Sequence, residues 1–123
     1  MYEVEIISSF AAAHSLRQYK GKCERLHGHN YRIHVTARSS APGSDGMVID
    51  FGDLKAVTNE ILDRLDHRFL NEIEPFDKIE PSAENIAAFI FQEIELGLNE
   101  RGVLLNCVGV WESDTSVARY IRG

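Results

Sequence analysis

The sequence predicts an α+β fold in which a four-stranded antiparallel sheet carries two helices on one face. Three observations predict it. Residues 30–39 alternate apolar and polar side chains with the period of two of a half-buried strand. Two later segments repeat apolar residues at helical spacing. The C-terminal part contains two further strand patterns, a strongly apolar one at 103–112 and another at 115–122. The predicted order is therefore β-β-α-α-β-β.

The N-terminal half predicts the first hairpin. Residues 2–13 are rich in β-formers and small residues, which indicates a strand. In the second strand, 30–39, one face carries Tyr31, Ile33, Val35 and Ala37, and the other carries Arg32, His34, Thr36 and Arg38. The cluster APGSDG, 41–46, is typical of a turn and ends this strand.

The helices follow this turn. The first shows apolar residues at helical spacing, namely Leu54, Val57, Ile61 and Leu65. Ser82 is a suitable N-cap for the second, and Glu84 lies in its first turn, where the helix dipole favours negative charge. The apolar stripe of that helix is Ile86, Phe89, Ile90, Ile94 and Leu98.

The two C-terminal strands are predicted at 103–112 and 115–122. Because residues 103–111 do not alternate cleanly, both faces of that strand are expected to be apolar and buried. Four strands also leave two edges to protect. We therefore expect association with other copies through the second face of the sheet.

Length and composition bound the class of protein. The 123 residues suit a single domain spanning 1–123, and 44% hydrophobic residues with 26% charged residues indicate a globular chain. No apolar run suffices to span a membrane, and the N-terminus lacks a signal-peptide pattern, so a cytoplasmic location is expected. The formal net charge of −6 argues against binding to nucleic acid or anionic membranes.

Three histidines form a candidate metal site. His27 and His29 are two residues apart, so an extended backbone points both rings to one side. His14 ends the first strand, and an antiparallel hairpin would bring it close to both. Three imidazoles leave one tetrahedral position open, which is the pattern of a catalytic zinc.

Cys23 lies four residues before His27, within the basic segment RQYKGKCER, 17–25. Nearby cations and a bound metal would each favour its thiolate. Cys23 could be a fourth zinc ligand or a base beside the metal, and spacing does not decide between them. The segment has a net charge of +3, which suggests a small anionic ligand.

Three further residues are candidates for chemistry. Asp66 and His67 are adjacent at the end of the first helix, where a carboxylate beside an imidazole can tune proton transfer. Glu112 ends an apolar strand directly after Trp111. Its carboxylate would pair well with a planar edge of two N–H donors, such as a pterin presents.

Six ordered motifs resemble those of the 6-pyruvoyltetrahydropterin synthase family, and within it the bacterial 6-carboxytetrahydropterin synthases of queuosine biosynthesis. The resemblance covers nearly the whole chain. The motifs are FAAAHSL (10–16), CERLHGHNY (23–31), MVIDFGDLK (47–55), LDHRFLN (65–71), PSAENIA (81–87) and VWESDTS (110–116).

The resemblance implies a role for each candidate. The zinc ligands would be His14, His27 and His29, and the proton-transfer group would be Cys23, Asp66 and His67. Glu112 resembles the family's pterin anchor. The fold implied is the tunnelling fold, in which several subunits form a barrel. A homo-oligomer, and specifically a hexamer with active sites at subunit interfaces, is therefore expected.

The implied substrate is dihydroneopterin triphosphate, with the basic segment contributing to triphosphate binding. The short gap between Cys23 and the HGH motif resembles the carboxy-forming branch, which releases acetaldehyde as well as triphosphate. Three alternatives remain open: the pyruvoyl-forming synthase, a pterin- or purine-binding zinc protein without turnover, and a structural zinc protein that Cys23 closes.

Overall fold

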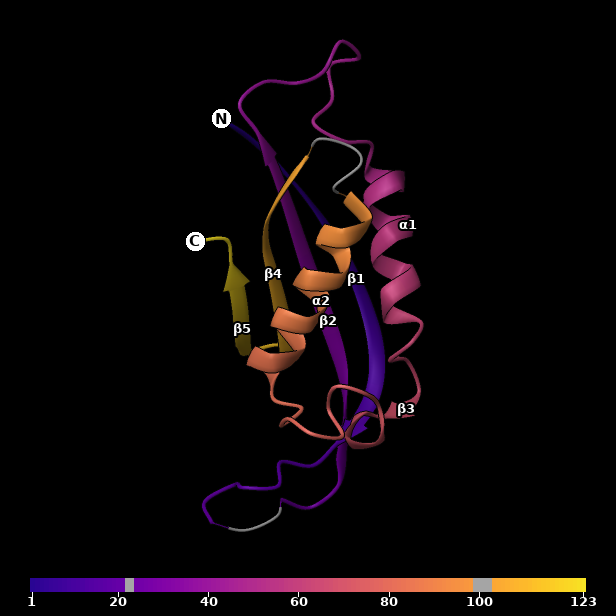
Figure 1. The fold of residues 1–123 in the computed structure, drawn as a ribbon, viewed down its shortest axis with the longest axis vertical. Helices are drawn as coiled ribbons and strands as arrows, with labels where there is room; N and C mark the ends of the chain where they lie inside the picture. Colours follow the sequence, from indigo (N-terminus) through magenta and orange to yellow (C-terminus); the bar gives the residue numbers. More distant parts are fainter. Residues whose placement is uncertain (22–23, 99–102) are drawn as a thin grey trace.

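The computed structural model describes residues 1–21, 24–98 and 103–123. The elements are β1 (Tyr2–His14), β2 (His27–Ser39), α1 (Phe51–Leu62), β3 (Arg68–Phe69), the 3-10 helix η1 (Leu70–Glu72), α2 (Ala83–Leu98), β4 (Leu104–Ser113) and β5 (Ser116–Ile121). The described strands form one sheet in the order β3-β1-β2-β4-β5, and both α-helices pack on one face of it (Figure 1). The predicted α+β class with two helices is confirmed.

The prediction of four antiparallel strands was wrong in one respect. The described sheet has a fifth strand, β3, which pairs in parallel with β1 through Ala12↔Arg68 and Ala13↔Phe69. A strand of two residues is too short to show an alternating pattern, so no feature of the sequence indicated it. β3 has a consequence for function, because it holds the preceding residues Asp66 and His67 at the end of β1.

The β1–β2 hairpin has one uninterrupted register from Tyr2↔Ser39 to His14↔His27. β2 begins at His27, three residues before the predicted start at residue 30. The HGH motif is therefore part of the strand, and its two rings share one face because side chains alternate along an extended backbone.

The core lies between the helices and the face of the sheet that carries the His27 and His29 rings. It contains Ile6 and Phe10 of β1, Tyr31, Ile33 and Val35 of β2, and Val108 and Val110 of β4, all at most 4% exposed. The helices contribute residues of their predicted stripes, among them Leu54, Ile61, Ile86, Ile90 and Ile94. Since His14, His27 and His29 continue the inward-facing alternation of β1 and β2, they lie on the helix-covered face, at the end of the core.

Both helices begin at capping residues. The Asp50 carboxylate accepts hydrogen bonds from the backbone N–H groups of Gly52 and Asp53 at the start of α1. The Ser82 hydroxyl accepts one from the Asn85 N–H at 3.2 Å, which confirms Ser82 as the predicted cap of α2. Neither described helix is long and apolar enough to cross a membrane.

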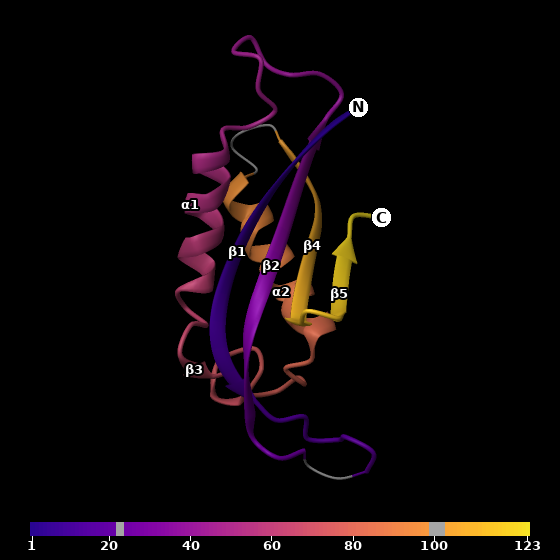
Figure 2. The ribbon, with the colours of Figure 1, turned by 180° about the vertical axis from the view of Figure 1, so that it is seen from behind.

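The outer face of the sheet is not covered by either helix (Figure 2), and it is more polar than predicted. Its β2 residues are Arg32, His34, Thr36 and Arg38, which alternate with the core residues. The register places Gly109 and Trp111 of β4 beside them, so the apolar run of β4 adds only one large apolar side chain to this part of the face. The Arg32 guanidinium covers that Trp111 ring at 4.9 Å from its centroid.

Candidate metal centre and catalytic residues

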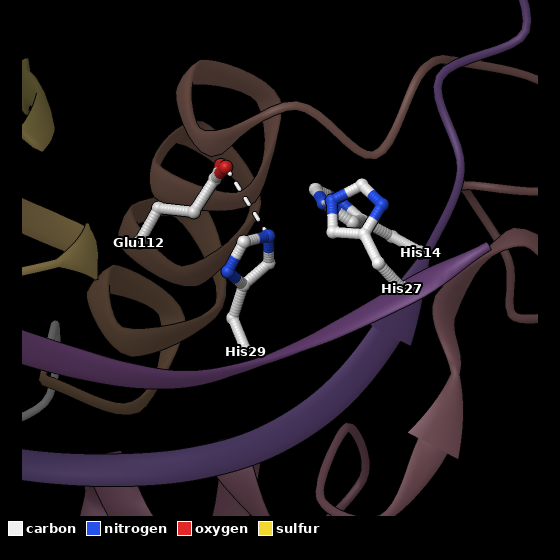
Figure 3. Close-up of side chains that lie close together, drawn as sticks. All are labelled: His14, His27, His29 and Glu112. Atoms are coloured by element: carbon white, nitrogen blue, oxygen red, sulfur yellow. Dashed lines mark hydrogen bonds and ion pairs between the residues drawn. The ribbon is translucent and has the colours of Figure 1, made fainter. Parts of the chain in front are cut away.

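The ends of β1 and β2 bring three imidazoles together, as the hairpin predicted. His14 pairs directly with His27 in the strand register, and His29 follows on the same face. The three ring centroids lie 4.6 to 5.0 Å from one another. Figure 3 shows the three rings converging together with Glu112 of β4.

The backbone sets the orientation of two of these rings. Nδ1 of His14 lies 2.7 Å from the Pro81 carbonyl oxygen, and Nδ1 of His27 lies 2.8 Å from the Arg25 carbonyl oxygen. A carbonyl only accepts, so each Nδ1 must carry the proton and each Nε2 of the neutral ring presents a lone pair. These two Nε2 atoms face each other at 3.0 Å. Two lone pairs at this distance repel, and a cation bound between them would turn the repulsion into attraction.

His29 completes the nitrogen set. Its buried Nε2 has no hydrogen-bond partner among the described residues, although a carboxylate oxygen of Glu112 lies 3.2 Å away. Burial is the main influence on this ring and lowers the pKa of His29, with the neighbouring His14 and His27 acting in the same direction, while Glu112 opposes them. The low pKa favours the neutral imidazole, which is the form that binds metal ions.

Together these groups form a cluster that can hold a metal ion. One ligand atom from each of His14, His27, His29 and Glu112 lies within 4.8 Å of all the others. Three imidazole nitrogens and one carboxylate oxygen suit a tetrahedral divalent metal such as zinc. The Nε2 of His29, which makes no hydrogen bond within the described residues, and the facing lone pairs of the other two rings both fit a bound cation.

Asp66 and His67 lie elsewhere at the same end of the sheet. The Asp66 carboxylate accepts the Ala11 N–H at 2.9 Å and contacts Nδ1 of His67, also at 2.9 Å. The hydrogen bond from Ala11 is the main cause of the lowered pKa of Asp66, followed by the hydrogen bond from His67. His67 adopts a φ of 58° and donates its own N–H to the Ala11 carbonyl, which leaves its ring 82% exposed.

A cavity of about 510 Å³ lies against this dyad, and its lining residues are Ala11, Ala12, Ala13, Gly28, His29, Asn30, His67, Arg68 and Phe69. By the strand register, Ala11, Ala13 and Asn30 point away from the helices, opposite to the three histidines. The structure therefore brings the histidines together within one chain, but it does not bring Asp66 and His67 into their cluster.

The basic segment is only partly available for an anionic ligand. Cys23 and Lys22 lie outside the described residues. The guanidinium of Arg17 is engaged by the chain itself, since it donates to the carbonyl oxygens of Asn71, Phe76 and Ile79. Lys20 is exposed, as is Arg25. The expectation that this segment binds triphosphate therefore rests on cations other than Arg17.

Glu112 also borders a second, smaller cavity of about 210 Å³, whose lining residues are Ala83, Glu84, Glu112, Ser116, Val117 and Ala118. Sequence reasoning treated Glu84 only as a favourable charge at the start of α2. The one sequence signal for a functional role of Glu84 was its place in the PSAENIA motif, two residues after Ser82. Only the packing of α2 against β5 brings Glu84 near Glu112.

The family to which these features belong is identified by comparison with known proteins. The profile of the family described as 6-pyruvoyl tetrahydropterin synthase matches residues 3–122. The chain belongs to this family. The pterin synthase family assignment agrees with the resemblance of the six motifs.

Individual relatives include both branches of the pterin synthases. The 6-carboxy-5,6,7,8-tetrahydropterin synthase of Synechocystis sp. is 44% identical over 118 residues, which are 91% of this chain and 87% of the relative. The 6-pyruvoyl tetrahydrobiopterin synthase of Homo sapiens is 35% identical over 104 residues, which are 81% of this chain and 70% of the relative. The structure of Caenorhabditis elegans 6-pyruvoyl tetrahydropterin synthase matches with a TM-score of 0.87 at 29% identity, covering 99% of this chain and 96% of that one.

Proposed function

We propose that the protein is a zinc-dependent lyase of queuosine biosynthesis, acting in the cytoplasm. It would convert 7,8-dihydroneopterin triphosphate and water into 6-carboxy-5,6,7,8-tetrahydropterin, acetaldehyde and triphosphate. The observation that carries this proposal is the convergence of three histidines and Glu112 in a pterin synthase. The higher identity to a relative named for the carboxy product supports that branch over the pyruvoyl branch.

The metal would be held by His14, His27 and His29. Zinc, when bound, supplies Lewis-acid polarisation of the substrate oxygens. The hydrogen bonds from Nδ1 of His14 and His27 to backbone carbonyls leave the Nε2 of each ring free, and these two nitrogens would bind the metal.

Proton transfer would be carried out by Cys23 and His67. The low pKa of Asp66 keeps its carboxylate anionic at neutral pH. It therefore accepts a hydrogen bond from the Nδ1–H of His67 and leaves the exposed Nε2 free to exchange a proton with substrate. Cys23 would act as base through its thiolate, as the family resemblance implies.

Glu112 would bind the pterin edge. Its carboxylate faces His29 and borders the small cavity that it shares with Glu84. A carboxylate can accept two parallel N–H bonds from the amino-pyrimidine edge of a pterin, which is a strong and directional interaction. In this position the carboxylate would orient the substrate ring with its side chain toward the three histidines.

We further propose that the protein is a homo-oligomer, a hexamer by resemblance, with active sites at subunit interfaces. On the outer face, buried atoms of Arg32, His34, Arg38 and Trp111 lack hydrogen-bond partners among the described residues, and a second copy could provide them. A second copy could also bring its Asp66 and His67 to the histidine cluster, which one chain alone does not do. Sedimentation at micromolar concentration should give a species of several chains, and a fully active monomer would contradict the interface proposal.

The proposed reaction is tested directly by its products. Zinc-loaded protein incubated with dihydroneopterin triphosphate should release acetaldehyde and triphosphate in equal amounts. Protein stripped of metal by a chelator is the matched control and should release neither. Triphosphate without acetaldehyde would assign the pyruvoyl-forming reaction instead, and binding of the pterin without either product would indicate a protein that does not catalyse the reaction.

A further inference from the structure

Arg17 ties the chain that follows β1 to the loop that precedes α2. Its guanidinium donates to the carbonyl oxygens of Phe76 at 2.6 Å, Ile79 at 3.1 Å and Asn71 at 3.2 Å. One planar group with five N–H donors can satisfy three carbonyls that point in from different directions. The loop that precedes α2 therefore wraps around the Arg17 guanidinium, which comes from the segment after β1.

Glu80 joins the same two segments with the roles of side chain and backbone reversed: the loop provides the side chain, and the segment after β1 provides the backbone groups. Its carboxylate accepts the backbone N–H groups of Arg17 at 3.0 Å and Gln18 at 3.1 Å, and it contacts the Arg17 guanidinium at 3.4 Å. The carbonyl of Glu80 accepts the side-chain amide of Asn85 in α2 at 2.9 Å. Glu80 is therefore held on both sides, by the segment after β1 and by the first turn of α2.

The residue after Glu80 contacts the candidate metal centre. The Pro81 carbonyl accepts a hydrogen bond from the Nδ1–H of His14 at 2.7 Å, and His14 is only 1% exposed. The segment from His14 to Gln18 and the segment from Asn71 to Pro81 are also joined by two hydrogen bonds between Ser15 and Asn71, of 2.9 and 2.7 Å. A closed chain of contacts thus runs from the Arg17 guanidinium to the ring of His14.

We propose that Arg17 and Glu80 are positioning residues for the metal centre. They hold the Pro81 carbonyl where it accepts a hydrogen bond from the Nδ1–H of His14, and so keep the Nε2 lone pair of that ring available to a metal ion. The inference rests on the proposed metal site, and it assigns Arg17 to the support of that site instead of to the triphosphate. Disturbing the outer contact of a ligating histidine, here the bond from His14 to the Pro81 carbonyl, typically costs 10-fold to 100-fold in metal affinity.

The test measures zinc affinity in the absence of substrate. Arg17→Met keeps the apolar stem and removes all the donors, so zinc affinity, measured by competition with a chromophoric chelator, should fall roughly 10-fold to 100-fold. Arg64→Met is the matched control, because Arg64 also forms an ion pair, with Glu93 of α2 at 2.7 Å, but it joins the residues after α1 to α2. Its zinc affinity should equal that of the wild type.

A spectroscopic readout separates positioning from general destabilisation. With Co²⁺ in place of zinc, the visible spectrum of Arg17→Met should change, whereas that of Arg64→Met should not. Arg17→Lys should restore little, because one ammonium cannot reach three separated carbonyls. If Arg17→Met fails to fold, Glu80→Gln serves in its place. This milder change leaves the Arg17 donors intact and should also lower zinc affinity.

Two results would overturn the inference in different ways. Wild-type zinc affinity and Co²⁺ spectrum in folded Arg17→Met and Glu80→Gln would show that the contacts do not position His14, while the metal site would stand. A wild-type protein that binds no zinc would instead remove the metal site, and the positioning role with it.

Discussion

Replacing His29 with alanine is expected to lower zinc affinity by roughly 100-fold to 1,000-fold and to abolish turnover. Structural zinc sites bind with about 10–16 kcal/mol, so one ligand of four is worth roughly 2.5–4 kcal/mol, which corresponds to this range at about 1.4 kcal/mol per factor of ten. His29 is the best ligand to replace, because its Nε2 makes no hydrogen bond within the described chain. His14, in contrast, is buried against Pro81 and Tyr31, and its loss would disturb the fold as well. A competition titration of metal-free protein measures the effect.

Glu112→Gln is the matched control, since Glu112 belongs to the same cluster. If Glu112 anchors the pterin, this variant should keep wild-type zinc affinity. It should bind neopterin, which lacks the triphosphate leaving group, about tenfold or more weakly, because a mismatched buried hydrogen bond costs roughly 1–3 kcal/mol. A fall in zinc affinity as large as that of His29→Ala would identify Glu112 as a fourth metal ligand. Unchanged affinity for both zinc and neopterin would remove Glu112 from the site.

Cys23→Ala is expected to retain stoichiometric zinc and to lower kcat by roughly 100-fold to 10,000-fold, the usual contribution of a general base. The expectation follows from the family resemblance and from the three-histidine cluster, which can hold a metal without a cysteine. Metal content after dialysis and the rate of triphosphate release under saturating substrate measure the two effects separately.

Cys107→Ala is the control for this experiment. Cys107 lies in β4, and burial raises the pKa of its thiol, so it carries little thiolate at neutral pH. This variant should keep both zinc and activity. If Cys23→Ala folds but loses its zinc, the thiol is a ligand and the site is a closed structural one, which would contradict the proposed role as a base.

Much of the candidate metal centre could be predicted from the sequence, because the meeting of its three histidines depends on local periodicity and on one hairpin. The two-residue spacing of His27 and His29 places both rings on one face of any extended strand. The antiparallel pairing of β1 with β2 then brings His14 opposite His27, as the structure has it. The stripes of the two helices, and the cap at Ser82, followed from the same kind of local pattern.

The surroundings of the centre could not be predicted in this way. The Pro81 carbonyl that orients His14 comes from 67 residues further along the chain, and the carbonyls that bind Arg17 come from 54 to 62 residues away. In the sequence, Arg17 is one of four cations in the basic segment 17–25, and the local pattern does not distinguish it from the other three. Only the packing of the loop before α2 distinguishes it from the others, because hydrogen bonds between distant segments depend on how the whole chain is folded.

By itself, then, the sequence determined the fold class, the face on which the three imidazoles lie and the family. The tertiary structure decided that β3 lies at the edge of the sheet beside β1, where Asp66 accepts the Ala11 N–H outside the histidine cluster. It also decided that Glu112 faces His29 and that Arg32, His34 and Arg38 lie on the outer face around Trp111. The physical reason is the range of the interactions. Side-chain alternation is a property of a few consecutive residues, whereas the meeting of groups from separate strands and loops depends on the register and packing that all of them adopt together.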